Sequence, residues 1–448
     1  MSTSITHRQR PARGALLKVG ALLTVGALAL GACGGDRGAA GPADTDTTAA
    51  EEGEDVTIRF SWWGSDTRHE VTQEVLDLFM AENPDITVVG DFTDWGGYWD
   101  KLSTTVAAGD APDVITQEER YLADYASRGV LADLSTLDID TAEVDPGVVA
   151  SGEVDGGLYG IATGINAYAV VADPQIFADA GVEMPDDTTW TWDDYVEIAS
   201  EISASGEDVF GAQDYGFNEP GFAIWARQQG QNLYTPEGTL GYDEQTLADW
   251  WQTSLDLQDS GGTPDAARSV EIDAGGPEQS LLGTNTGAMG VWWTNQLGAI
   301  SAAAGRDLEL LRFPGESEHE RTGMYFKPAM YYSVAETSQH PEAAAKLVDF
   351  LLNDPAAGEL MLSDRGMPAN TSVRDGIQEL LPPVEQQAAA FLEDLEDEIV
   401  DGAPVPPVGA GEVVEIIRRI NTEVLFGRLS PQEAAAQFTA EVEAATGS

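Results

Sequence analysis

The sequence has a single cysteine, Cys33, in 448 residues. An intramolecular disulfide is therefore impossible, and a packed core must hold the fold together. Histidine is nearly as scarce. Beyond residue 33 only His69, His319 and His340 remain, and no two of them have the spacing of metal ligands. We therefore expect neither a bound metal nor a cofactor.

Basic residues are also few, since 22 Lys and Arg face 77 Asp and Glu, for a net charge of −55. The only lysines are Lys18, Lys101, Lys327 and Lys346. So acidic a chain repels nucleic acid, which excludes a nucleic-acid partner. The acids are spread along the whole chain, so we interpret them as a solvated, salt-adapted surface. A cation-binding role is the alternative.

Several catalytic signatures are missing from the sequence. It has no Gly-x-Gly-x-x-Gly or P-loop motif in a suitable context, and no Gly-x-Ser-x-Gly elbow. Nucleotide-dependent and serine-hydrolase chemistry therefore lack support. Apolar runs are short as well, and no stretch reaches the roughly 20 residues of a membrane-spanning helix.

The N-terminal segment has the pattern of a processing signal. Basic residues between positions 7 and 18 precede an apolar run from Val19 to Leu30. The next residues, Leu30-Gly31-Ala32-Cys33, resemble a bacterial lipobox, in which the cysteine is lipidated and becomes the first residue. We expect residues 1–32 to be a lipoprotein signal peptide and Cys33 to carry the lipid, with a short membrane anchor as the alternative.

Residues 33–55 read as a flexible tether, because they are rich in Gly, Ala, Thr, Asp and Glu and nearly devoid of large apolar side chains. Lipid on Cys33 would place the protein on the outer face of the cytoplasmic membrane, outside the cytoplasm. The remaining chain is long enough for two domains.

From residue 56 onward, strand and helix patterns alternate. The first five predicted elements are a strand at 56–62, a helix at 70–83, a strand at 86–89, a helix at 98–108 and a strand at 113–116. This β-α-β-α-β order predicts a mostly parallel sheet with flanking helices, hence an α/β fold. Further strands are predicted at 158–161, 167–172 and 287–292. Further helices are predicted at 192–203, 246–260, 341–352, 411–426 and 431–445.

Seven short segments resemble one known family in their order and spacing. They are Val-Thr-Ile-Arg-Phe-Ser-Trp-Trp-Gly at 56–64, Phe-Met-Ala-Glu-Asn-Pro-Asp-Ile at 79–86, Gly-Gly-Tyr-Trp-Asp-Lys-Leu at 96–102, Ala-Gly-Asp-Ala-Pro-Asp-Val at 108–114, Gly-Leu-Tyr-Gly-Ile at 157–161, Met-Gly-Val-Trp-Trp-Thr-Asn at 289–295 and Arg-Gly-Met-Pro at 365–368. The family is that of the extracellular solute-binding proteins, family 1, which includes the maltose-binding-protein-like sugar-binding lipoproteins of ABC importers. The resemblance covers nearly all of residues 56–430.

The resemblance implies a two-lobed periplasmic-binding-protein type II fold, with a ligand cleft between lobes joined by a hinge. Lobe 1 would hold residues 56–164 and 322–352, and lobe 2 residues 165–321 and 353–448. It also implies a monomeric, non-enzymatic protein that captures a sugar and delivers it to the transmembrane subunits of an ABC permease.

A sugar offers apolar faces to aromatic rings and hydroxyls to charged or amide groups. At the end of the first strand, alternation should turn one of Trp62 and Trp63 toward the cleft, and we select Trp63. Trp95 and Tyr98 flank two glycines in an expected loop, where an aromatic ring has less core to enter, so both are candidates for ligand contact. Core packing is the alternative for each.

Polar candidates follow other predicted strands. The family often has a sugar-binding acid near Glu118, for which helix capping is the alternative. Asn166 ends the segment 163–166, the expected first crossing between lobes. Glu219 and Trp225 resemble a cleft loop of the second lobe.

The last candidates come from the C-terminal half. Trp293 and Asn295 resemble the family's stacking aromatic segment. Tyr325 and Lys327 lie near the expected second crossing. The segment 406–414, where the family carries its last aromatic site element, has no aromatic residue here, so we expect a smaller stacking surface.

Two other functions remain open. The ligand could be another small solute such as a polyamine, which acids and aromatic rings would suit. A secreted glycoside hydrolase is the less favoured alternative, since it needs two carboxylates at a fixed separation.

Overall fold

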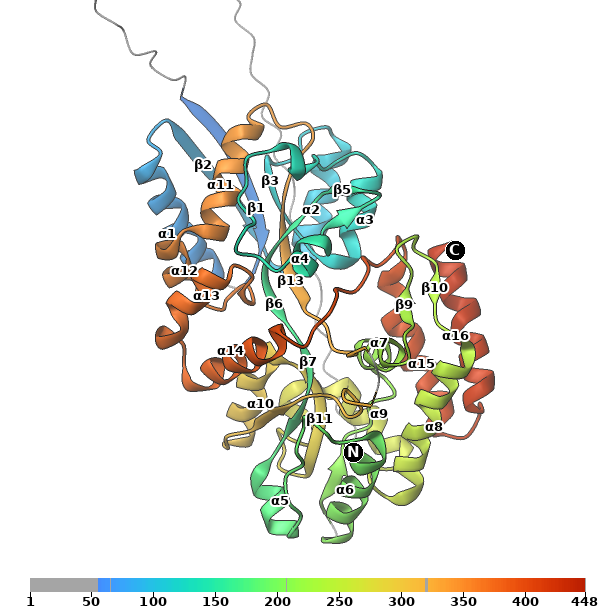
Figure 1. Cartoon of the computed structure of the whole chain (residues 1–448). Coiled ribbons are helices and arrows are strands. Elements are labelled where there is room, and N and C mark those ends of the chain that lie inside the picture. The colour runs from blue at the N-terminus through green and yellow to red at the C-terminus, as the bar shows by residue number, and fades with distance from the viewer. Residues whose placement is uncertain (1–54, 65, 207, 319–320, 448) are drawn as a thin grey trace, which may run out of the picture. The chain divides into compact units, whose positions relative to one another are not determined.

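Two mixed β-sheets, both flanked by helices, organise the chain (Figure 1). The computed structural model describes residues 55–64, 66–206, 208–318 and 321–447. The predicted signal peptide and Cys33 lie outside the described residues, as does the tether except for Asp55. No helix in these ranges combines the length and apolar character of a membrane span.

The six-stranded sheet has the order β14-β6-β13-β3-β1-β2. Its strands are β1 (Val56–Trp63), β2 (Ile86–Thr93), β3 (Val114–Gln117), β6 (Ile161–Asn166), β13 (Lys327–Val334) and β14 (Met367–Pro368). The predicted parallel arrangement is confirmed for β2, β1 and β3. It is wrong for the rest of the sheet, because β13 runs antiparallel to β3 and β6, and β14 runs antiparallel to β6. Local alternation cannot reveal the direction of strands that arrive from so far along the chain.

The four-stranded sheet has the order β12-β7-β11-β8. Its strands are β7 (Tyr168–Ala172), β8 (Phe210–Ala212), β11 (Gly287–Trp293) and β12 (Glu309–Leu311). β7 pairs antiparallel with both β11 and β12, and β8 lies parallel to β11. Two small hairpins complete the β structure, formed by β4 (Glu153–Val154) with β5 (Gly157–Leu158) and by β9 (Asn232–Tyr234) with β10 (Leu240–Gly241).

One set of helices packs around the six-stranded sheet. They are α1 (Asp66–Glu82), α2 (Trp95–Ala107), α3 (Glu119–Ser127), α4 (Pro146–Ala150), α11 (Pro341–Asn353), α12 (Pro355–Met361) and α13 (Thr371–Ile377), with the 3₁₀ turns η1 (Leu134–Thr136) and η4 (Gln378–Leu380). The resemblance assigns residues 355–377 to lobe 2. In the structure α12 packs on α1 and α11, and β14 extends the six-stranded sheet.

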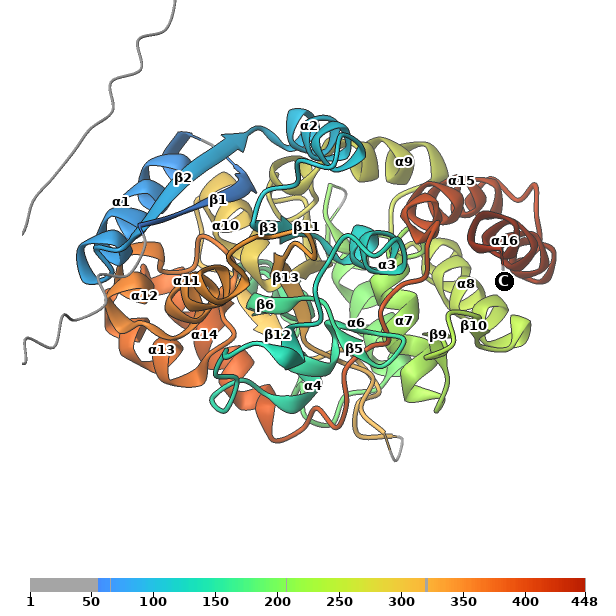
Figure 2. The ribbon, with the colours of Figure 1, turned by 90° about the horizontal axis from the view of Figure 1, so that it is seen from above.

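The other helices belong with the four-stranded sheet. They are α5 (Pro174–Ala180), α6 (Trp192–Ala204), α7 (Glu219–Gln228), α8 (Glu244–Ser260), α9 (Ala266–Gly275), α10 (Leu297–Ala304), α14 (Pro383–Glu396), α15 (Val413–Leu425) and α16 (Pro431–Thr446), with η2 (Pro277–Gln279), η3 (Thr294–Gln296) and η5 (Ala410–Glu412). Seen from above, α15 and α16 lie side by side against α8 (Figure 2).

Local chemistry explains several element boundaries. Thr191 forms a capping box with Asp194 and so starts α6. Pro341 occupies the first turn of α11, where its missing N–H leaves no helix hydrogen bond unmade. Gly181 closes α5 with a positive φ that a side chain would disfavour. In the core below α7, Trp250 and Trp251 of α8 are fully buried.

The chain passes from the six-stranded to the four-stranded sheet at Ala167, between the end of β6 and the start of β7. The expected crossing segment 163–166 instead lies within β6. The chain returns at Lys327, the first residue of β13. These two passages bring Asn166 and Lys327 into register as neighbours, next to the beginning of β7.

Candidate functional site

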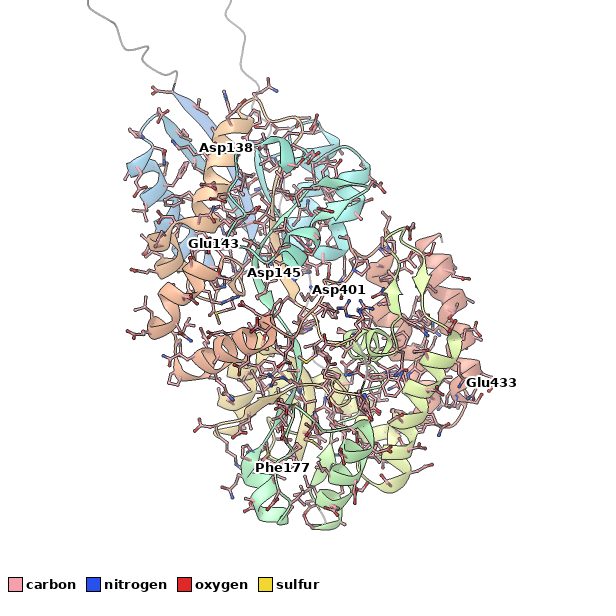
Figure 3. The ribbon with its side chains drawn as sticks, viewed as in Figure 1. Asp138, Glu143, Asp145, Phe177, Asp401 and Glu433 are labelled. Atoms are coloured by element: carbon pink, nitrogen blue, oxygen red, sulfur yellow. The ribbon has the colours of Figure 1, made fainter. Side chains whose placement is uncertain are left out.

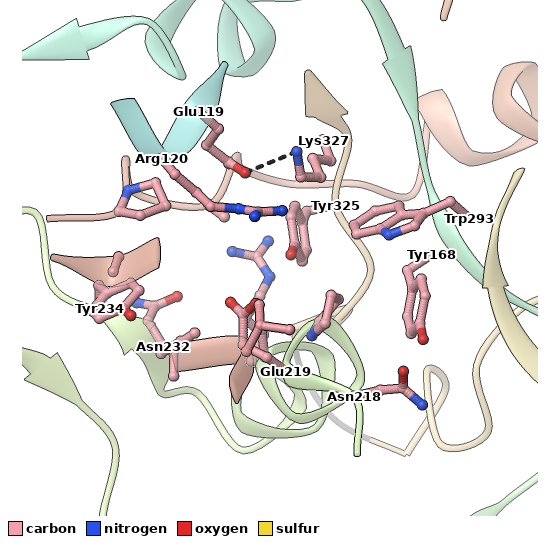
Figure 4. Close-up of a pocket in the computed structure, with 18 of the residues that line it drawn as sticks. Glu119, Arg120, Tyr168, Asn218, Glu219, Asn232, Tyr234, Trp293, Tyr325 and Lys327 are labelled. Carbon is pink, nitrogen blue, oxygen red and sulfur yellow. Dashed lines mark ion pairs between the residues drawn. The ribbon is translucent and has the colours of Figure 1, made fainter. Parts of the chain in front are cut away.

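A pocket of about 260 Å³ is lined by residues of both sheets and of the segment that precedes and enters α15. Figure 4 shows the side chains around it. The six-stranded sheet contributes through α3 and β13, and the four-stranded sheet through β7 and β11. The helix α7 and strand β9 form another part of the wall. Such a position, at strand ends, is where open α/β sheets hold ligands.

Aromatic rings make one wall of the pocket. Trp293 ends β11 and lies opposite Tyr168, the first residue of β7, with ring centroids 4.8 Å apart. The Tyr168 hydroxyl donates to the Val291 carbonyl at 3.2 Å, which fixes the ring. Tyr234 and Tyr325 also line the pocket. The wall therefore offers flat apolar faces beside polar edges.

Lys327 connects the aromatic wall to the acids of α3. Its Nζ lies 3.0 Å from Glu119 Oε2 and 4.0 Å from Glu118 Oε1. The same nitrogen is 5.7 Å from the Trp293 ring centroid. Desolvation by burial opposes the charged form, but Glu119 and Glu118 outweigh it and raise the Lys327 pKa above its usual value. Lys327 is therefore a fixed cation at the edge of the pocket.

Glu219 faces the pocket from the first turn of α7. Its carboxylate has neither a hydrogen bond nor an ion pair with any residue that the structure describes. Burial raises its pKa to about 7, and the charge of Glu119 adds to this, against the opposing effects of Arg120 and Lys327. A carboxylate so placed is available to a ligand that supplies hydrogen-bond donors.

Arg227 fastens the segment that follows α14 to α7. It is 1% exposed, and its guanidinium donates to the carbonyl oxygens of Gly323, Gly402 and Asp401 and to the Asp401 carboxylate. Asp401, labelled in Figure 3, also pairs with Arg321. These contacts hold the chain that continues into the pocket wall at Ala403 and Pro404.

Two further arginines line the pocket and have ion pairs but no hydrogen bonds with their acidic neighbours. Arg120 Nε lies 3.6 Å from Glu118 Oε1, and Arg418 lies 3.3 Å from Asp273 and 3.5 Å from Glu415. Neither guanidinium makes a hydrogen bond within the described ranges. Both side chains are close to half exposed, at 46% and 44%.

The pocket collects four of the residues that the sequence selected: Glu219, Trp293, Tyr325 and Lys327. The structure places the others outside its lining: Trp63, Trp95, Tyr98, Glu118, Asn166, Trp225 and Asn295. Trp62 and Trp63 are both buried. Trp63 contacts the rings of Trp95 and Tyr98, and the Tyr98 hydroxyl donates to the Thr116 carbonyl.

The remaining predicted residues have local partners. Glu118 is the N-cap of α3 and accepts from the Arg120 N–H. Asn166 is buried at the end of β6. Trp225 lies within helix α7 rather than in a loop, and its indole donates to the Thr246 carbonyl. Asn295 is exposed in η3, while its neighbour Gln296 lines the pocket.

Sequence reasoning missed several lining residues, among them Glu119, Arg120, Tyr168, Asn232, Tyr234, Gln296 and Arg418. Two of them, Glu119 and Gln296, directly follow a selected residue in the sequence. The scarcity of basic residues was a usable signal for Arg120 and Arg418, since a cation in so acidic a chain is uncommon. The expected lack of aromatic residues at 406–414 is visible in the lining, where Pro406, Ala410 and Val414 form that part of the wall.

The family model described as bacterial extracellular solute-binding protein matches residues 63–358. A solved family 1 extracellular solute-binding protein from Alicyclobacillus acidocaldarius is similar, with a TM-score of 0.75 and 28% identity over 87% of this chain and 98% of that one. A periplasmic oligogalacturonide binding protein from Yersinia enterocolitica shares the fold, with a TM-score of 0.77 and 22% identity over 87% and 100%.

A lipoprotein of Streptomyces antibioticus is 30% identical over 156 residues, which are 34% of this chain and 34% of that protein. The first curated relatives are matched over 42% of their own length. These matches are therefore partial, whereas the structural similarity extends over most of the chain.

Proposed function

This chain belongs to the bacterial extracellular solute-binding proteins, and from that membership we propose that it captures a saccharide outside the cell and delivers it to an ABC permease. In this proposal Cys33 carries the lipid that retains the protein at the outer face of the cytoplasmic membrane. The two sheets belong to lobes that close on the ligand about the passages at residues 167 and 327.

The observation that carries the proposal is the composition of the pocket at Trp293. One pyranose face can lie on this indole, because contact with Tyr168, its neighbour on the paired strand, holds the ring in place. Hydroxyls at the rim can donate to Glu219, which has no described partner, and accept from Lys327. Aromatic faces combined with a few convergent polar groups are typical of small-molecule sites.

Among the alternatives, the lining disfavours a polyamine. Within the described part of the chain two acids line the pocket, Glu119 and Glu219, and Lys327 already pairs with Glu119, so a polyamine would find only Glu219 as an unpaired lining acid. The observation that favours glycoside hydrolysis is the presence of Glu119 and Glu219 in one pocket, one paired with a lysine and one with a raised pKa. Family membership opposes it. Release of reducing sugar from oligosaccharides would distinguish catalysis from binding.

The proposal is tested by a thermal-shift screen of neutral and acidic mono- and oligosaccharides. A ligand that binds only the folded state stabilises it by about 2.7 kcal/mol at one hundred times its Kd. We expect at least one saccharide to raise the melting temperature of the wild-type protein. Absence of any shift across the panel, with a shift from spermidine or another amine, would contradict the proposal.

A further inference from the structure

The two half-exposed arginines in the pocket differ from nearly all others in the protein. Within the described ranges, every other arginine except Arg268 donates at least one side-chain hydrogen bond. Arg120 and Arg418 donate none, although acidic residues greatly outnumber basic ones. Their carboxylate partners, Glu118 for Arg120 and Asp273 with Glu415 for Arg418, lie at 3.3–3.6 Å without forming hydrogen bonds, so the guanidinium N–H groups can still donate to a ligand.

Arg120 and Arg418 approach the pocket along the same wall. The Cδ of Arg120 lies 4.0 Å from the point where a side chain on Gly411, in η5, would begin. From η5 the chain enters α15, where Val414 and Arg418 are four residues apart, so they share one face of the helix, and both line the pocket. Figure 4 shows Arg120 extending into the pocket toward Tyr325.

The lining acids leave this pair available. Glu119 is engaged by Lys327 at 3.0 Å. Glu219 faces Arg120 across the pocket without forming an ion pair with it (Figure 4). Because burial raises the Glu219 pKa to about 7, a large share of this group is uncharged at neutral pH. An anion beside Arg120 is therefore repelled less than it would be if Glu119 and Glu219 were both ionised.

We propose that Arg120 and Arg418 bind an anionic substituent, so that the saccharide taken by this pocket is an acidic one. The inference rests on the proposed function and refines it. The planar guanidinium fork matches carboxylate and phosphate oxygens, which gives charge-assisted hydrogen bonds. A uronic acid and a sugar phosphate both offer such oxygens. Comparison of their affinities shows which of the two the pocket prefers.

The test is calorimetric titration of the purified protein with matched sugars: glucose, glucuronate and glucose 6-phosphate, and the corresponding galactose series. We expect one acidic member to bind about ten-fold or more tightly than its neutral counterpart. Whether the carboxylate or the phosphate is preferred identifies the source of the anion. A neutral sugar that binds as tightly as both acidic counterparts overturns the inference and leaves the proposed function standing. Failure of these sugars together with binding of a neutral oligosaccharide in the thermal-shift screen overturns the inference alone, and failure of the whole screen overturns both.

Variants locate the effect. Arg120→Gln and Arg418→Gln should each reduce the affinity for the acidic sugar about ten-fold and leave the neutral counterpart nearly unchanged. Arg120→Lys, which keeps charge without the fork, should recover part of the loss. Arg268→Gln is the matched control, since Arg268 is exposed outside the pocket and also lacks a hydrogen bond. The ratio of acidic to neutral affinity is insensitive to a general loss of folded protein. An unchanged ratio in both pocket variants overturns the assignment.

Discussion

The ammonium of Lys327 lies 5.7 Å from the centre of the Trp293 ring, so that a residue of β13 in the six-stranded sheet meets a residue of β11 in the four-stranded sheet. The two residues are close in the sequence and in space, but they belong to different sheets. Their contact marks the place where the chain returns from one sheet to the other. It joins a stacking surface to a fixed cation.

Replacement of this lysine should weaken ligand binding. In Lys327→Gln the cation–π contact and the ion pair with Glu119 are both lost. A hydrogen bond from a charged group contributes about 1.5–3 kcal/mol, so loss of the one that Lys327 can donate to a saccharide should raise the Kd about ten-fold or more, measured by calorimetry. Lys346→Gln is the control, because Lys346 is an exposed lysine on α11. Equal affinities in the two variants would remove Lys327 from the site.

Glu219 should make stability depend on pH. Its pKa is about 7 in the folded protein and 4.5 in the reference state, so between these values the folded state keeps a proton that the unfolded chain has released. The contribution of this group to the unfolding free energy therefore falls as pH rises from about 4.5 to 7. We expect Glu219→Gln to be more stable than wild type by about 1–2 kcal/mol at pH 8 and about equal at pH 4.

A second buried glutamate provides the control for this experiment. Burial also raises the Glu316 pKa to about 7, but its carboxylate accepts from Gln228 and from the N–H groups of Gly323 and Met324. An amide cannot accept at both positions, so Glu316→Gln should be destabilised at either pH. Chemical denaturation at the two pH values measures both variants. A Glu219→Gln protein that is less stable than wild type at pH 8 would show that the carboxylate has a structural partner.

Lipid attachment is tested at Cys33, which lies outside the described residues. The only cysteine of the chain has no disulfide partner to lose. We expect Cys33→Ala to leave the thermal unfolding of the folded part unchanged and either to release the protein from the membrane fraction or to block signal removal. Fractionation of cells followed by mass analysis provides the measurement. A processed variant that remains with the membrane would contradict lipidation at this residue.

Hinge closure predicts a change of dimensions in solution. If the two sheets belong to lobes that rotate together on a ligand, small-angle scattering of the monomer should show a smaller radius of gyration with saturating saccharide. The passages at residues 167 and 327 would absorb the change of backbone angle. Superimposable scattering curves with and without a ligand that binds by calorimetry would exclude a closing hinge.

Much of the fold follows from periodicity along the sequence. Alternating apolar residues located the strand at Val56, and a helical stripe located α1. The first parallel strands were predicted because each is joined to the next by a helix. The antiparallel direction of β13 was not predicted, because it depends on the path of the whole chain between residues 172 and 327.

The site was harder to predict than the fold. Trp63 and Tyr98 have the loop-edge positions of ligand contacts, but five aromatic side chains gather there and cover one another. At α3 the helix begins one residue later than the candidate acid. Glu118 therefore turns back to cap the backbone, and Glu119 lines the pocket. A single residue of offset decides such a role, and sequence patterns do not fix helix ends that closely.

The central claim, that the pocket at Trp293 binds a saccharide, is tested most directly on Trp293→Ala. Trp293 lies at the end of β11 and is only partly buried, so its indole is available to a sugar ring. Loss of an aromatic anchor commonly costs about 2 kcal/mol or more of binding free energy. We expect at least a roughly ten-fold loss of saccharide affinity with little change in the melting temperature of the ligand-free protein. Normal affinity with a sharply lowered melting temperature would contradict the account and place Trp293 in the core.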